Sequence, residues 1–137
     1  MTRLHPRLEQ DCHYVSRLEL CHLLLMNDSH YPWCILVPDR EDITEIHQLD
    51  EADQQQLIRE SSRLARGLTR LYRPDKLNIA AIGNLVPQLH VHHVVRYTGD
   101  PAWPAPVWGH GAAMPYSDMA ARETITRLRN AIVEIPT

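Results

Sequence analysis

The chain has 137 residues, of which 44% are hydrophobic and 23% charged, values that fit a single globular domain spanning 1–137. The formal net charge of -3 excludes a general nucleic-acid binder, so an anionic ligand would have to be attracted by a local site. Apolar runs such as Leu23–Met26 are far too short to span a bilayer, so we expect no membrane partner.

The number and spacing of the cysteines indicate the cellular compartment. Cys12, Cys21 and Cys34 form no Cys-x-x-Cys pair, and the first residues show no secretory signal. We therefore expect a cytoplasmic protein whose thiols are reduced and structural.

In the first fifty residues, short apolar segments alternate with turn signals. Glu19–Met26 and Trp33–Val37 are predicted to be strands joined by a hairpin turn. Ile43–Leu49 is predicted to be a short helical turn. The N-terminal stretch carries a weaker pattern, in which Leu4 and Leu8 are spaced to share one face of a short helix.

The second half gives clearer signals. Asp50 is a good N-cap for a long helix that Pro74 ends, and leucines recur along it at helical spacing. Two strands are predicted to follow, at Leu77–Ile82 and Val86–Tyr97, and Ser117 caps a final helix. The order of strands, helix, strands and helix predicts an α+β domain with an antiparallel sheet on which the long helix and the C-terminal helix pack.

The most informative segment lies within the last predicted strand. Because side chains alternate along a strand, Gln88, His90 and His92 should share one face and His93 the other. His90 and His92 would then be about 7 Å apart along that face. Two imidazoles at this distance can act on one phosphate, one attacking phosphorus and the other holding or protonating an oxygen. The main-chain carbonyl two residues before the attacking histidine is a natural acceptor for its second ring proton.

Spacing alone leaves two other interpretations open. His-x-His is a common metal-ligand spacing, with a third ligand from His30, His47 or His110. The two histidines could also be ordinary half-buried polar residues.

The run from Gly83 to His92, followed by Arg96, resembles the signature of the histidine-triad (HIT) family. In that pattern Gln88 occupies the first triad position, His90 the central one and His92 the last. The resemblance covers roughly residues 20–110, and the sequence looks like a bacterial branch described as HIT-like or dinucleoside-polyphosphate hydrolases. It implies a HIT-like fold, a homodimer, and no metal or other cofactor at the triad.

The resemblance also implies roles by position. His90 would be the nucleophile that takes the nucleotidyl phosphorus, giving a covalent intermediate that water resolves. His92 would contact the phosphate or the leaving-group oxygen. Asn27 falls where the family places a ribose contact, and Asn84 where it places a phosphate contact. Arg96 could meet a phosphate, although a surface ion pair is an equal alternative.

Gln88 departs from the usual triad, because an amide cannot carry a proton near neutral pH. The main-chain oxygen of residue 88 is retained whatever the side chain, so we expect hydrolysis of dinucleoside polyphosphates or nucleoside phosphoramidates to survive with altered rate or preference. The alternative is a nucleotide-binding module with weak or no turnover. A small metal-binding protein is a third hypothesis.

Overall fold

The computed structural model describes residues 2–135, and in this part of the chain five strands form one antiparallel sheet in the order β1-β2-β3-β5-β4. The strands are β1 Cys12–Arg17, β2 Cys21–Met26, β3 Trp33–Pro38, β4 Lys76–Ala81 and β5 Val91–Arg96. The helical elements are α1 Pro6–Asp11, the 3₁₀ turn η1 Ile46–Gln48, α2 Glu51–Tyr72 and α3 Asp118–Glu134. The predicted α+β class, with an antiparallel sheet, a long helix and a C-terminal helix, is confirmed.

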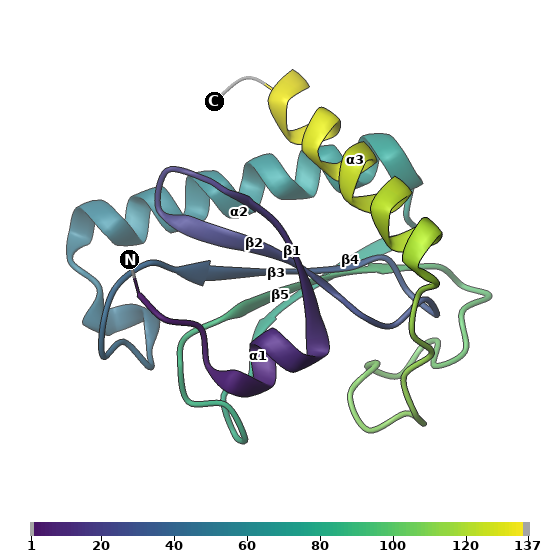
Figure 1. The fold of residues 1–137 in the computed structure, drawn as a ribbon, viewed down its shortest axis with the longest axis horizontal. Helices are drawn as coiled ribbons and strands as arrows, with labels where there is room; N and C mark the ends of the chain where they lie inside the picture. Colours follow the sequence, from purple (N-terminus) through teal and green to yellow (C-terminus); the bar gives the residue numbers. More distant parts are fainter. Residues whose placement is uncertain (1, 136–137) are drawn as a thin grey trace.

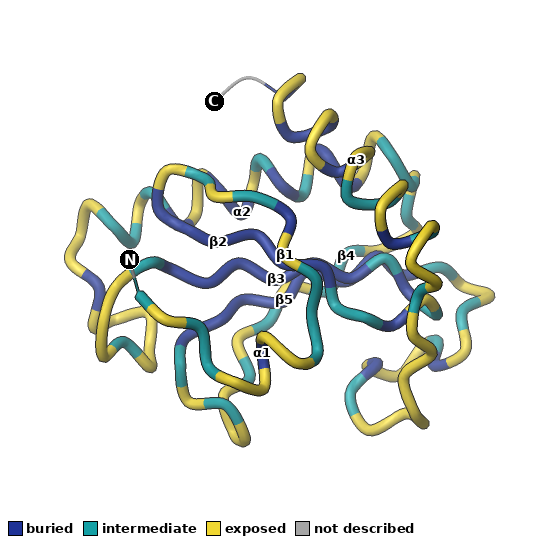
Figure 2. The backbone as a smooth tube through the Cα atoms, in the orientation of Figure 1, coloured by how far each residue is buried: buried dark blue, intermediate teal, exposed yellow. Residues whose placement is uncertain are grey.

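The two faces of the sheet have different covers. In Figure 1, α2 and α3 lie on one side of the strands and α1 on the other. Figure 2 shows the central strands β2, β3 and β5 as the most deeply buried part of the chain. The core is correspondingly divided, with Leu64 of α2 and Leu128 of α3 in one apolar cluster and Leu8 of α1 in the other.

The long helix forms where its sequence signals predict. The Asp50 side chain accepts a hydrogen bond of 2.8 Å from the main-chain N–H of Asp53, which satisfies one of the free donors of the first turn. Leu57, Leu64 and Leu68 are buried against the sheet. Arg73, with φ at 47°, ends the helix in a left-handed conformation.

The histidine strand is shorter than predicted. β5 begins at Val91 rather than at Val86, and residues 83–90 run as an irregular segment. Pro87 has no N–H to donate to a ladder, and the N–H of Leu89 bonds instead to the main-chain oxygen of Ile43, at 2.9 Å. Gln88 and His90 therefore precede the strand instead of lying in it.

The first strand of the sheet was not predicted at all. β1 is an edge strand that pairs only with β2 in the sheet order, and its register shifts between Tyr14 and Ser16. Only Val15 among its residues is buried, so the strand lacks the run of apolar positions on which the prediction of a strand depends. The predicted short N-terminal helix is present as α1 and contains Leu8, but it begins at Pro6, so Leu4 precedes it.

The cysteines are free, as expected. Cys21 and Cys34 are buried and Cys12 is partly so, and burial raises the pKa of Cys12 and Cys34 to about 12. Thiols of this kind stay protonated and are poor nucleophiles. Across residues 2–135, no helix is both long and apolar enough to cross a membrane.

Candidate active site

The neighbouring histidines of β5 point to opposite faces of the sheet. His93 faces α2, where its Nε2 accepts a hydrogen bond of 2.7 Å from the hydroxyl of Ser61. Its Nδ1–H donates to the main-chain oxygen of Val91, at 3.1 Å. Burial lowers the pKa of His93 to about 4, so the ring is neutral near pH 7. His93 is thus part of the core between sheet and helix, and the prediction that it points away from its neighbours is confirmed.

His90 and His92 lie together on the other side. Their ring centroids are 5.0 Å apart and the ring planes are 72° from parallel. The rings are closer than the strand rise predicts, because His90 lies before the regular strand. The fold brings together the two imidazoles that the sequence predicted to lie side by side.

The ring of His90 is oriented by the backbone. Its Nδ1 lies 2.7 Å from the main-chain oxygen of Gln88. A carbonyl can only accept, so Nδ1 carries the hydrogen and Nε2 of the neutral ring keeps its lone pair. This is the tautomer that a nucleophilic histidine requires.

The ring of His92 lies among aromatic side chains. Trp33 of β3 donates its indole N–H to Nδ1 of His92, at 3.0 Å. Trp108, from the loop before α3, packs edge-on against the same imidazole with centroids 5.2 Å apart. Burial, followed by the proximity of His90 and His93, lowers the pKa of His92 to about 3. His92 is therefore a neutral imidazole near pH 7.

The histidine pair is nearly closed off from solvent. His90 and His92 are each 5% exposed. A cavity of about 20 Å³ touches His90, with room for roughly one water molecule. A larger cavity of about 410 Å³ lies outside it and shares Thr44 and Gln88 with it. That volume falls in the range of small-molecule sites, so a ligand could occupy the outer cavity and reach His90 only if the wall between them moved.

The wall is formed in part by the Gln88 side chain. Its Oε1 accepts from the main-chain N–H of His5, at 2.8 Å, and its Nε2 donates to the main-chain oxygen of Arg3, at 3.1 Å. Leu4 and Leu8 continue the same segment into the apolar cluster on this face of the sheet. Gln88 does not lie in the strand as predicted, because residue 88 precedes β5, and its amide bonds to the N-terminal segment on this face of the sheet.

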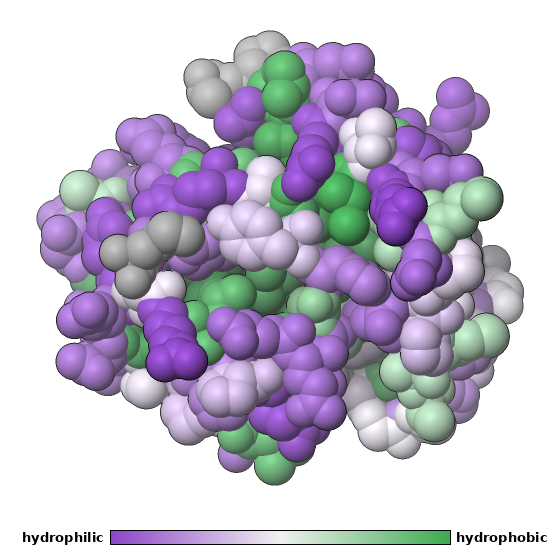
Figure 3. Space-filling view, in the orientation of Figure 1, coloured by the Kyte–Doolittle hydropathy of each residue, from purple (hydrophilic) through white to green (hydrophobic). Residues whose placement is uncertain are grey.

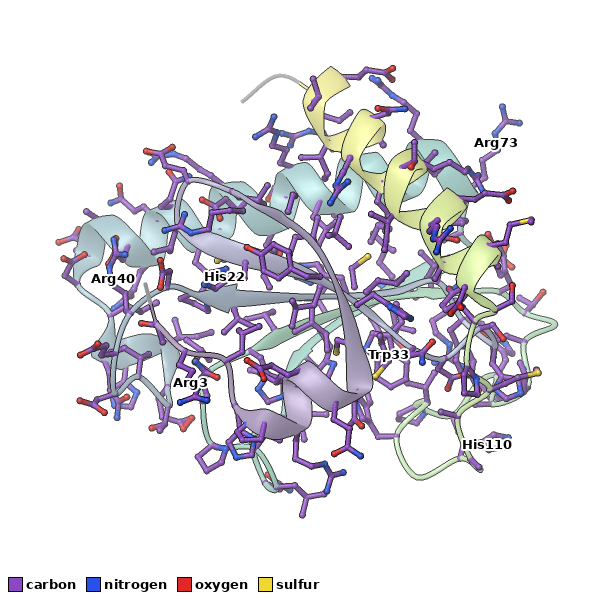
Figure 4. The ribbon with its side chains drawn as sticks, viewed as in Figure 1. Arg3, His22, Trp33, Arg40, Arg73 and His110 are labelled. Carbon is purple, nitrogen blue, oxygen red and sulfur yellow. The ribbon has the colours of Figure 1, made fainter. Side chains whose placement is uncertain are left out.

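Figure 4 places Arg3 and Arg40 at one end of the sheet, and both line the outer cavity. Trp33 lies toward the other end, near the loop that carries His110. In Figure 3, apolar surface shows at the bottom of a hollow over the central strands, with polar side chains around it. Some apolar surface on this face of the sheet is therefore open to solvent.

Arg96 lies at the far end of β5 and is not brought to the histidine pair. It is 1% exposed, and its guanidinium donates two hydrogen bonds to Asp100, at 2.8 and 3.0 Å. Further bonds run to Asn78 Oδ1 and the main-chain oxygen of Ala105. These contacts correct the expectation of a phosphate contact: Arg96 forms a buried ion pair, and four hydrogen bonds from its guanidinium already go to protein atoms.

In the described part of the chain, the structure shows no contact between the histidine pair and the two asparagines predicted to bind substrate. Asn27 follows β2 at the end of the sheet opposite His90, and its Oδ1 accepts from Tyr116 N and bonds to His13 Nε2. Asn84 lies in the exposed turn before Gln88. Their substrate contacts remain predictions.

The described residues provide no set of metal ligands around the histidine pair. Among residues 2–135, no group of three or more His, Cys, Asp or Glu side chains is arranged to hold a metal ion. The Nδ1 atoms of both histidines are already bonded, to Gln88 O and to Trp33 Nε1. Their Nε2 atoms alone would have to serve as ligands.

Trp33 is the residue that sequence reasoning missed. It was predicted only as the start of an apolar strand, and its partner depends on the β3–β5 register, in which Trp33 lies opposite Val94 and Ile35 opposite His92. An indole is an apolar ring with one donor, so a strand tryptophan near a histidine strand is the one signal that could have drawn attention to it.

Taken together, the fold and the paired imidazoles define an α+β domain that presents a backbone-oriented histidine beside a second histidine. The HIT domain matches residues 7–99, and the chain belongs to this family. No curated protein matches it.

Solved bacterial structures are similar over nearly the whole chain. The histidine triad protein blr8122 from Bradyrhizobium japonicum is 48% identical, with a TM-score of 0.92 over 95% of this chain and 97% of its own. A histidine triad protein from Marinobacter aquaeolei VT8 is 46% identical, with a TM-score of 0.95 over 99% of each chain. One from Sinorhizobium meliloti 1021 is 44% identical, with a TM-score of 0.92 over 94% of this chain and 96% of its own. Proteins of this family are generally nucleotide-binding hydrolases or transferases.

Proposed function

We propose that the protein is a nucleotide hydrolase or nucleotidyl transferase in which His90 attacks phosphorus. The observation that supports this proposal most strongly is the 2.7 Å bond from His90 Nδ1–H to the oxygen of Gln88. It leaves the Nε2 lone pair as the reactive atom and holds the ring in one orientation.

The reaction has two steps. His90 Nε2 forms a bond to the nucleotidyl phosphorus as the phosphoanhydride P–O or phosphoramidate P–N bond breaks, and the leaving group departs with the electron pair and gains a proton from solvent. Water then attacks the same phosphorus, the P–N bond to His90 breaks, and a nucleoside monophosphate leaves. His92, with its ring 5.0 Å away, contacts the phosphate.

Substrate binding requires a movement of the N-terminal segment. The histidine pair is 5% exposed and the inner cavity, about 20 Å³, is far smaller than a nucleotide. The outer cavity of about 410 Å³ adjoins it at Gln88. We therefore place the nucleotide in the outer cavity, with its phosphate reaching His90 after Gln88 releases the segment.

The test measures turnover of dinucleoside polyphosphates and adenosine phosphoramidate by the parent protein and by His90→Ala, in assays without added metal. We expect the loss of nearly all activity in His90→Ala, and a transient mass increase of one nucleotidyl group in the parent after an alkaline quench. His110→Ala is the matched control, since His110 lies in an exposed loop. Equal turnover by parent and His90→Ala would reject the proposal.

A second candidate is a nucleotide-binding module with little turnover. The closure of the site and the contact between Gln88 and the N-terminal segment favour it. This candidate predicts saturable nucleotide binding by the parent without the covalent adduct. Analytical ultracentrifugation would test the expected homodimer in either case.

A further inference from the structure

The indole of Trp33 and the imidazole of His92 form a buried hydrogen bond. Trp33 Nε1–H donates to His92 Nδ1 at 3.0 Å, and the ring centroids are 5.7 Å apart. The pairing of β3 with β5 puts Ile35 opposite His92, so Trp33 reaches the imidazole from the diagonal position on the same face. Two adjacent strands therefore fix this contact.

The chemistry of the indole decides the state of the imidazole. An indole N–H can only donate, so Nδ1 of His92 must offer a lone pair. The hydrogen of the neutral ring is then on Nε2. Protonation of Nδ1 would turn two donors toward each other in a buried place and would leave the indole N–H without an acceptor, which is unfavourable for a buried polar group.

The surroundings of His92 also favour the neutral form of its imidazole. The ring is 5% exposed, and the titratable groups that act on it are His90, just before its strand, and His93 within it, both bases. From β3 and from the loop before α3, the rings that touch it are those of Trp33 and Trp108, which carry no charge. Nothing among these neighbours favours an imidazolium.

We propose that Trp33 is a positioning residue that holds His92 as a neutral imidazole with its hydrogen on Nε2. This inference rests on the proposed function and specifies the role of the second histidine in it. His92 then binds an oxygen of the transferred phosphate as a neutral hydrogen-bond donor and does not act as a general acid. The proton that the leaving group gains comes from solvent, and His92 ends each cycle in the state in which it began.

The test reads the tautomer directly and needs no substrate. Histidine ring correlations of the ¹⁵N-labelled full chain are recorded from about pH 5 to 8, the range in which an ordinary histidine titrates, and His92→Gln assigns the signals. We expect the parent to show a protonated Nε2 and an unprotonated Nδ1 in His92 throughout. A protonated Nδ1, or an ordinary titration near pH 6.5, overturns the inference without any variant being needed.

Two tryptophan variants separate the hydrogen bond from packing. Trp33→Phe keeps a ring but removes the donor, and we expect His92 to populate both tautomers and its pKa to rise. Trp108→Phe is the matched control, because Trp108 also packs on His92 but its buried N–H bonds to no protein atom among the described residues. An unchanged tautomer in Trp33→Phe overturns the inference.

Activity gives a readout that separates this inference from the proposed function. If the parent forms the His90 adduct, kcat/KM should show no ionisation assignable to His92 between about pH 5 and 8. Trp33→Phe should lower kcat severalfold and introduce a new ionisation. If the parent forms no adduct, the proposed function fails, whereas the tautomer measured by NMR still decides the inference about Trp33.

Discussion

The side-chain oxygen of Gln88 accepts a hydrogen bond of 2.8 Å from the main-chain N–H of His5, and this contact joins the loop before β5 to the N-terminal segment on the same face of the sheet as the histidine pair. The amide group of the same side chain donates to the oxygen of Arg3. Gln88 therefore contributes its main-chain oxygen to His90 and its side chain to the contact with the N-terminal segment.

The first prediction concerns the contact between Gln88 and the N-terminal segment. Gln88→Ala retains the main-chain oxygen that orients His90 but removes both bonds to the N-terminal segment. We expect hydrogen exchange at the His5 amide to accelerate by about two- to tenfold, the equivalent of one ordinary hydrogen bond, and nucleotide turnover to rise. Gln55→Ala, an exposed glutamine of α2, is the control. Unchanged exchange at His5 would show that Gln88 does not hold the segment.

The second prediction concerns the ion pair at the far end of β5. Asp100→Asn leaves the buried guanidinium of Arg96 without its carboxylate, and breaking such a pair from one side costs about 3–5 kcal/mol of unfolding free energy. Urea denaturation measures this cost. The exposed change Asp118→Asn, made at the start of α3, should cost less than about 1 kcal/mol. Equal denaturation midpoints for the two variants would contradict the structural role of the pair.

The third prediction concerns pH. The pKa of His93 is lowered to about 4 in the folded chain, against an ordinary value near 6.5. Between about pH 6.5 and 4 the residue is therefore protonated in the unfolded chain and neutral in the folded one. Its contribution to the free energy of unfolding is complete above about pH 6.5 and decreases as the pH falls toward about 4. His92, with its pKa lowered to about 3, acts in the same direction.

His93→Asn removes one of these two groups. We expect a lower free energy of unfolding at pH 7, because the contact with Ser61 is altered, together with a shallower decrease between about pH 6.5 and 4. Denaturation curves at several pH values give the slope. A slope as steep as that of the parent would mean that His93 does not titrate in this window.

The fourth prediction concerns the start of β2. The carboxylate of Glu60, on α2, accepts from the main-chain N–H groups of Leu20 and Cys21, at 2.7 and 2.9 Å. Glu60→Gln replaces one acceptor oxygen with a donor that faces a main-chain N–H, so we expect a loss of about 1–3 kcal/mol in thermal or urea unfolding. Glu51→Gln, exposed in the first turn of the same helix, serves as the comparison and should change little.

Much of the framework is predictable from local sequence. The helix signals are local: the Asp50 and Ser117 caps, the leucine spacing of α2 and Pro74 mark where the two helices begin and end. The placement of His93 opposite its neighbours also follows from strand alternation alone. The extent of the histidine strand was less predictable, because Pro87 and the bond from Leu89 to Ile43 end it early.

The sequence by itself determined that a main-chain carbonyl lies two residues before His90 whatever the side chain at 88, because every residue carries one. The backbone conformation of the segment before β5 then decided that the His90 ring bonds to it. Only the tertiary structure decided which side chains surround the pair: the indole of Trp33 comes from another strand, Trp108 from a distant loop, and the partner of Gln88 from the N-terminus. Such contacts depend on strand register and on chain segments far apart in sequence, and no local pattern of residues encodes them.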